Sequence, residues 1–115
     1  MIHNEAHKLA NAMKNSQEYQ AFLVVKRELD KDASAKKMAQ DFMKQKLAME
    51  YETMSGQKEN PEKMARLQQA YTLLANHGVA REFVEKHMRL QQMMGDVFKI
   101  INDAVAEGMD IFAEK

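Results

Sequence analysis

Two histidines near the start of the chain have the spacing of a metal chelate. His3 and His7 are four residues apart, so on a helix they share one face, a geometry that suits zinc, copper or nickel. Metal sites in proteins add a third ligand and outer groups that orient the ligands, and the sequence offers neither nearby. We therefore expect both histidines to be exposed, with no metal bound.

The other two histidines do not indicate catalysis. His77 belongs to a predicted helix-ending turn, and His87 lies beside an apolar stripe, where a packed or interface histidine is the better interpretation. Neither has a serine or cysteine nearby in a nucleophile arrangement. We predict no catalytic residues and no enzymatic activity.

The composition excludes several kinds of cofactor site. The chain has no cysteine, which rules out disulfides, thiolate metal sites and cysteine-ligated iron–sulfur clusters. No glutamate is followed three residues later by histidine, as a di-iron carboxylate site requires. The four glycines are dispersed, so no glycine-rich phosphate loop is present. We expect no cofactor.

The charge balance predicts which partners the chain avoids. Its 17 basic and 17 acidic residues cancel, which removes the field that draws a protein to nucleic acid or to an anionic membrane. The start of the chain lacks a secretory pattern, and no stretch approaches the roughly 20 apolar residues of a membrane span. We expect a cytoplasmic protein that binds neither nucleic acid nor membrane directly.

Apolar spacing and capping residues predict an all-α fold in a single domain of residues 1–115. About five helices are expected, with two long ones near residues 33–55 and 79–112. In the second helix the apolar stripe is expected to hold Tyr19, Phe22, Leu23, Lys26 and Leu29. The residues expected to cap or end helices are Asn4, Ser16, Asp32, Gly56 and Asn60, with Pro61 at a first helical position.

The last of these helices is the most informative element. Apolar residues recur there at intervals of seven, namely Phe83, Leu90, Val97, Ala104 and Ile111. At about 1.5 Å per residue the helix would run roughly 50 Å, whereas a compact chain of this size is about 35 Å across. We therefore predict a helical bundle completed by oligomerisation. The predicted oligomer or partner interface consists of Phe83, Leu90, Met93, Met94, Val97, Ile100 and Ile101.

Two features of this helix can each be interpreted in two ways. Eleven methionines are many for this length, and Met88, Met93 and Met94 suit either core and oligomer packing or an adaptable groove for a partner. Gly95 suits either a close helix crossing or a tolerated surface position.

Several capping and packing positions resemble those of the bacterial YlbF/YmcA family, particularly its YheA-like branch. They span nearly the whole chain and support fold and lineage better than mechanism. The matching residues are Ser16-x-Glu18-Tyr19-x-x-Phe22 with Lys26 and Leu29, Asp32-x-x-Ala35 with Phe42 and Gln45, and Asn76-x-x-Val79-x-x-x-Phe83 with Leu90.

The resemblance implies a small cytoplasmic all-helical protein that self-associates as a homodimer or higher oligomer. Better-known members are non-enzymatic adaptors in RNA processing and in competence, biofilm and sporulation control, whereas the YheA-like branch is largely uncharacterised. Some members carry cysteines linked to iron–sulfur binding, and this chain has none, so that cofactor is not carried over. A second departure is His87, where the family pattern is expected to favour an acidic residue.

Two functions fit these sequence features and the family resemblance. The first is an adaptor that binds itself and other regulatory proteins. The second is a regulator that acts on RNA processing or decay through protein partners. Direct RNA binding is disfavoured, because it calls for clustered basic residues among exposed aromatics, and the four arginines are scattered along the chain. The sequence leaves open the partner, the oligomer number and any exchange of helices between subunits.

Overall fold

The computed structural model describes residues 1–109 and 111. Over this range the chain forms five α-helices and no strand, which confirms the predicted all-α class. The helices are α1 (Ile2–Lys14), α2 (Gln17–Asp30), α3 (Ala33–Met54), α4 (Pro61–Ala75) and α5 (Gly78–Met109).

The predicted end of the last helix needs correction. Helix α5 ends at Met109 within the described residues, and Ile111 lies in a bend, where its backbone N–H donates to the Met109 carbonyl. The seven-residue repeat is therefore helical only as far as Ala104. Asp110 and Phe112, which fall inside the predicted range of 79–112, lie outside the described residues.

Short polar side chains start α2 and α3, as the sequence predicts. The Ser16 hydroxyl accepts a hydrogen bond from the backbone N–H of Tyr19 at 3.2 Å. The Asp32 carboxylate accepts from the backbone N–H of Ala35 at 3.0 Å. Each cap satisfies an amide that has no partner inside its own helix.

The loop between α3 and α4 also forms as predicted. The Asn60 side chain accepts from the backbone N–H of Glu62 at 2.9 Å, and Pro61 occupies the first helical position. Gly56 has a φ of 79°, a left-handed conformation in which a side chain would be strained.

The predicted cap at Asn4 is wrong. Helix α1 begins at Ile2, and the Glu5 N–H already donates to the Met1 carbonyl at 3.1 Å. All residues of α1 up to Ala12 are exposed, so water can satisfy the free amides at its start and no side-chain cap is required.

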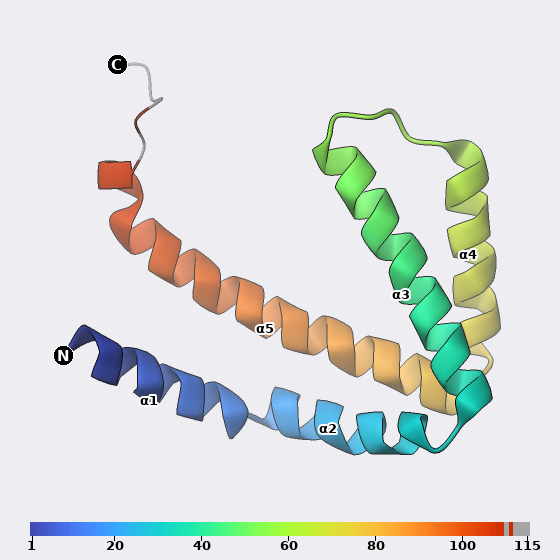
Figure 1. Ribbon diagram of the computed structural model, residues 1–115, viewed down its shortest axis with the longest axis horizontal. Helices are drawn as coiled ribbons and strands as arrows, with labels where there is room; N and C mark the ends of the chain where they lie inside the picture. Colours follow the sequence, from blue (N-terminus) through green and yellow to red (C-terminus); the bar gives the residue numbers. More distant parts are fainter. Residues whose placement is uncertain (110, 112–115) are drawn as a thin grey trace.

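The helices spread from one corner instead of closing into a bundle (Figure 1). Helix α2 runs beside the first half of α5, and α3 and α4 form a hairpin that rises from the same corner. Helix α1 and the second half of α5 extend away as separate arms. The chain measures 48 × 39 × 14 Å with a radius of gyration of 18.0 Å, whereas a compact chain of this length has about 13 Å.

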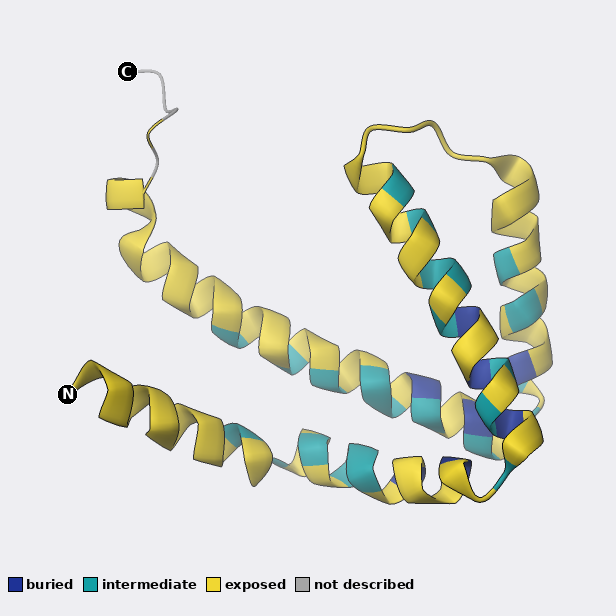
Figure 2. Cartoon of the chain, viewed as in Figure 1, coloured by how far each residue is buried: buried dark blue, intermediate teal, exposed yellow. Residues whose placement is uncertain are grey.

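The hydrophobic core lies at this corner, where α2, α3, α4 and α5 meet (Figure 2). Small residues on α3 and α5 allow the helices to approach closely, and Leu74 of α4 is fully buried between them. The cluster consists of Leu29, Ala35, Ala39, Phe42, Leu74, Ala80 and Val84. This corner is the rigid base from which the arms extend.

Polar side-chain contacts reinforce the connections at the corner. The Asp30 carboxylate lies 3.2 Å from Nζ of Lys36 and 3.5 Å from Nζ of Lys26, and the Lys36 hydrogen bond contributes most to lowering the pKa of Asp30. Nε2 of His77 lies 3.4 Å from the carboxylate of Asp32, which joins the turn before α5 to the turn before α3.

Candidate functional site

One face of α5 packs on α2 and holds four of the seven residues of the predicted interface. Phe83, Leu90, Met93 and Val97 are half-buried and recur at helical spacing along this face. In one chain they are therefore covered in part by the protein itself. The remaining predicted residues, Met94, Ile100 and Ile101, keep 51%, 70% and 51% of their surface exposed.

An aromatic cluster fixes the contact between α2 and α5. The Phe22 ring lies 5.3 Å from the Phe83 ring and 5.7 Å from the His87 ring, measured between centroids. Burial lowers the pKa of His87, and the positive charge of Lys46 lowers it further. His87 is therefore held as a neutral packed ring, in agreement with its predicted role as a packed or interface histidine.

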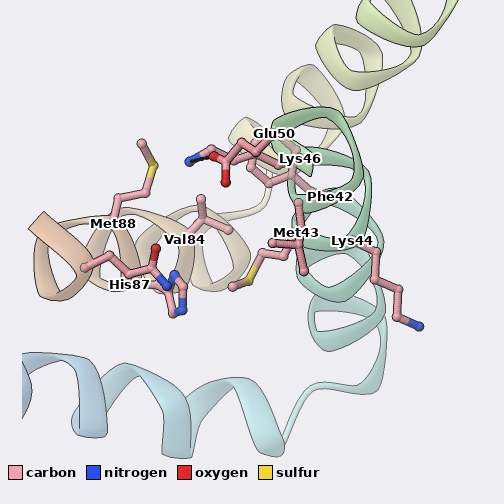
Figure 3. Close-up of a pocket in the computed structure, with 10 residues that line it drawn as sticks. Phe42, Met43, Lys44, Lys46, Glu50, Val84, His87 and Met88 are labelled. Atoms are coloured by element: carbon pink, nitrogen blue, oxygen red, sulfur yellow. Dashed lines mark ion pairs between the residues drawn. The ribbon is translucent and has the colours of Figure 1, made fainter. Parts of the chain in front are cut away.

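A groove of about 310 Å³ lies between α3 and α5, where the two helices begin to diverge (Figure 3). We call it the α3–α5 groove. Its lining residues are Phe42, Met43, Lys44, Lys46, Leu47, Glu50, Val84, His87, Met88 and Gln91. The surface is mostly apolar, and in Figure 3 Met43 extends from α3 toward α5, whereas His87 lies on the α2 side of α5.

The charged groups of this groove are placed at its rim. Lys46 and Glu50 form an ion pair at 3.8 Å along α3, and Lys44 points away from α5 (Figure 3). Because the charges pair with each other or face outward, the floor of the groove offers apolar contact.

A second hollow, of about 260 Å³, lies where α1, α2 and α5 come together. We call it the methionine cleft. It is lined by Met13, Lys14, Tyr19, Leu90, Met93 and Met94. Three flexible thioethers in one small surface suit a partner helix whose side chains vary.

The far part of α5 carries a run of exposed apolar residues. Every described residue from Phe98 to Met109 is exposed. The apolar members with the largest exposed fractions there are Phe98 (66%), Ile100 (70%), Ile101 (51%), Val105 (54%) and Met109 (73%). Their polar neighbours form one opposite stripe, with Lys99 and Asp103 paired at 2.7 Å.

The long third helix was expected to pack between subunits, but the predicted interface residues all lie on α5, and the exposed apolar residues of α3 were not named among them. Leu47, Tyr51 and Met54 are 68%, 72% and 87% exposed, although they continue the apolar stripe that is buried at Ala39 and Phe42. The signal was present in the sequence, because α3 is long and its stripe stays apolar to the end. Only the arrangement of the helices shows that its outer part has no cover within the chain.

The residues in these hollows are suited to binding by shape and apolar contact. In residues 1–109 and 111, no three histidine, aspartate or glutamate side chains are grouped to hold a metal ion. His3 and His7 are both exposed. None of the helices described here is long and apolar enough to span a membrane.

A sequence model of the family described as Control of competence regulator ComK, YlbF/YmcA matches residues 2–106. The chain belongs to the YlbF/YmcA family. The match takes in α1 to α4 and most of α5, so the capping and packing positions that suggested the family lie within it.

Relatives in this family are bacterial proteins of matching length. A UPF0342 protein from Caldicellulosiruptor saccharolyticus is 33% identical over 104 residues, which cover 90% of this chain and 87% of the relative. A UPF0342 protein from Symbiobacterium thermophilum is 31% identical over 104 residues, covering 90% and 93%.

A solved structure shares the arrangement of helices. The Protein of Unknown Function (DUF964) from Bacillus stearothermophilus superposes with a TM-score of 0.73 over 97% of this chain and 98% of its own. At 18% sequence identity, this likeness supports the fold alone.

Proposed function

We propose that this YlbF/YmcA protein is a non-enzymatic, self-associating adaptor that binds other regulatory proteins in the cytoplasm. The observation that supports it best is the exposed apolar face of α5 beyond Val97. Monomeric proteins rarely expose contiguous apolar patches larger than about 300–600 Å² unless the patch binds something. Phe98, Ile101 and Val105, which keep 66%, 51% and 54% of their surface exposed, therefore favour the binding of a partner on this face.

The side chains in the α3–α5 groove favour binding over turnover. Its titratable groups are Lys46, Glu50 and His87, with Lys44 directed outward. Lys46 is paired with Glu50, and the neutral His87 ring packs between Phe22 and the groove. An enzyme needs polar groups that converge on a reacting atom, and these groups engage each other instead.

The family description concerns control of a competence regulator, which favours a regulatory role. We assign partner binding to the methionine cleft, with an amphipathic helix of a regulatory protein as the bound element. Such a helix would place its apolar side chains against Met93, Met94 and Tyr19, in the manner of helix-in-groove recognition.

Affinity purification of tagged protein, followed by mass spectrometry, tests this role. The variant Met93→Glu places a charge in the cleft, and Gln92→Glu places the same charge on the neighbouring exposed position. We expect wild type and Gln92→Glu to retain the same protein partners, and Met93→Glu to lose them. RNA that stays bound to the purified protein after all other proteins are removed would contradict an adaptor role.

A further inference from the structure

We infer that two copies of this chain pair antiparallel through α5, with the far half of each α5 filling the α3–α5 groove of the other copy. This inference rests on the self-association in the proposed function and specifies its geometry. Four observations carry it: a mostly apolar seam at seven-residue spacing, a groove beside its near half while its far half is uncovered, the opposite charges of the two halves, and the length of the helix.

The seam runs along the side of α5 that faces the opening between α3 and α5. Val84, Gln91, Phe98 and Val105 follow one another at intervals of seven, and His87, Met94 and Ile101 flank them at the alternate positions. This spacing is the a and d pattern of helices that pack along their length. The seam is therefore built for a second helix over its whole extent.

The two halves of the seam differ in how they are covered. The near half, with Val84, His87 and Gln91, forms one wall of a groove of about 310 Å³. The far half, with Phe98 and Val105, projects its side chains with no cover from the chain's other described residues. A twofold axis places each projecting half in the groove of the other copy, so both grooves and both projecting halves are covered at once.

Charge selects the antiparallel direction. The near half of α5 is net positive, with Arg81, Lys86 and Arg89 against Glu82 and Glu85. The far half is net negative, with Asp96, Asp103 and Glu107 against Lys99. Antiparallel pairing sets unlike halves side by side, whereas parallel pairing would set two negative halves together.

The length of the helix sets the register. A twofold axis near Asp96 brings Val105 opposite His87, Ile101 opposite Gln91, and Phe98 opposite Met94. A shift by seven residues in one direction would leave Val84 and His87 uncovered. The opposite shift would carry Met109 beyond Gly78, where α5 begins.

Gly95 is consistent with this axis. In one chain a Cβ at Gly95 would meet nothing within 4 Å, so no helix of the same chain crosses closely there. Beside the axis, the missing side chain allows the two α5 backbones to approach each other.

Spin labels on the polar stripe of α5 measure both direction and register. The chain has no cysteine, so single variants Asp96→Cys, Lys99→Cys, Asp103→Cys and Glu107→Cys each carry one label per copy. In the inferred pair the separation along the axis rises from near zero at residue 96 to about 9, 21 and 33 Å at residues 99, 103 and 107, since each residue adds about 1.5 Å on each side.

A second set of variants tests the contact through α5 separately from self-association. The same labels in a Phe98→Asp background should lose their coupling, while circular dichroism shows that most of the helix remains. Light scattering on unlabelled protein reports the oligomeric state independently. The result expected for wild type is a dimer whose inter-label distances increase steadily away from residue 96.

Other outcomes overturn the inference in distinguishable ways. Equal distances at all four positions would show a parallel pair, and a minimum away from residue 96 would show another register. A dimer without coupling between the labels would exclude α5 as the contact while leaving self-association intact. A monomer at tens of micromolar would remove both the inference and the self-association on which it rests.

Discussion

Val84 and Val105 occupy the same position of the same seven-residue repeat on α5, yet their surroundings differ completely. Val84 keeps 3% of its surface exposed and Val105 keeps 54%. The residue type, the helix and the face are the same, so these do not explain the difference. The cause is the convergence of α3 and α4 on the first half of α5 and their divergence from the second half (Figure 1).

The comparison separates two meanings of an apolar repeat. Near the corner, the repeat reports contacts that stabilise the fold of one chain. Along the arm, the same repeat is exposed, and it is the surface that we propose binds a further molecule. Substitutions in the first region should change folding, and substitutions in the second should change association.

The largest difference is expected between Val84→Asp and Val105→Asp. An aspartate at position 84 would bury a charge without a partner, which costs several kcal/mol and should unfold the corner. At position 105 the same change should leave the corner folded and dissociate the oligomer. Urea unfolding followed by circular dichroism, together with light scattering, measures both effects. Equal loss of helix in the two variants would contradict the comparison.

The next effect contrasts Leu74→Ala with Leu47→Ala. Leu74 is fully buried, so its truncation should lower the free energy of unfolding by about 2–5 kcal/mol at any protein concentration. Leu47 is 68% exposed in one chain but would be covered in an oligomer. Its truncation should therefore lower the free energy of unfolding only at protein concentrations where the oligomer forms. Denaturation curves at two protein concentrations distinguish the two behaviours.

A smaller effect is expected at the cap of α3. Replacing Asp32 by alanine removes the acceptor for the Ala35 N–H and should cost about 1 kcal/mol. Asp41→Ala is the control, because Asp41 is exposed in the middle of the same helix. Thermal unfolding measures both variants. If Asp41→Ala destabilises as much as Asp32→Ala, capping is not the cause.

The smallest effect is a pH dependence at His87. Because burial lowers its pKa in the folded state, the unfolded chain binds the proton more readily. This contribution to stability is therefore complete above the unfolded value of about 6.5 and is lost as pH falls from there toward the lowered folded value.

Melting temperatures between pH 7.5 and 5.5 test this dependence. His87→Gln should reduce the loss of stability on acidification, and the exposed variant His7→Gln should not. An unchanged pH profile in His87→Gln would assign the acid sensitivity to another group.

Local interactions made the helix boundaries predictable. Ser16, Asp32 and Asn60 each cap a helix within three residues of their own position, so the necessary information lies in a few neighbouring residues. The same rule was wrong for Asn4, because an exposed helix start is hydrated and has no need of a cap. Asn60 caps α4 although it is exposed as well, so exposure allows a helix to start without a cap but does not prevent capping.

One position on the buried face of α2 was less predictable. The sequence pattern placed Lys26 on the apolar stripe, whereas the structure buries Val25 to 7% exposure and leaves Lys26 beside Asp30 at 3.5 Å. The other residues of the predicted stripe are buried or half-buried, namely Tyr19, Phe22, Leu23 and Leu29. The two arrangements therefore differ at this one position. The choice depends on packing against Phe83 and the corner, which no short window of sequence contains.

The sequence by itself determined the class of this protein: five helices, polar caps for three of them, a glycine stop, two helices longer than a compact chain needs, and a family signature. These features arise from hydrogen bonds and periodicity over a few residues. Only the tertiary structure decided which part of each apolar face is covered. It placed the core at one corner, opened a groove between α3 and α5, and left the far half of α5 without cover, because these outcomes depend on the angles at which distant segments meet.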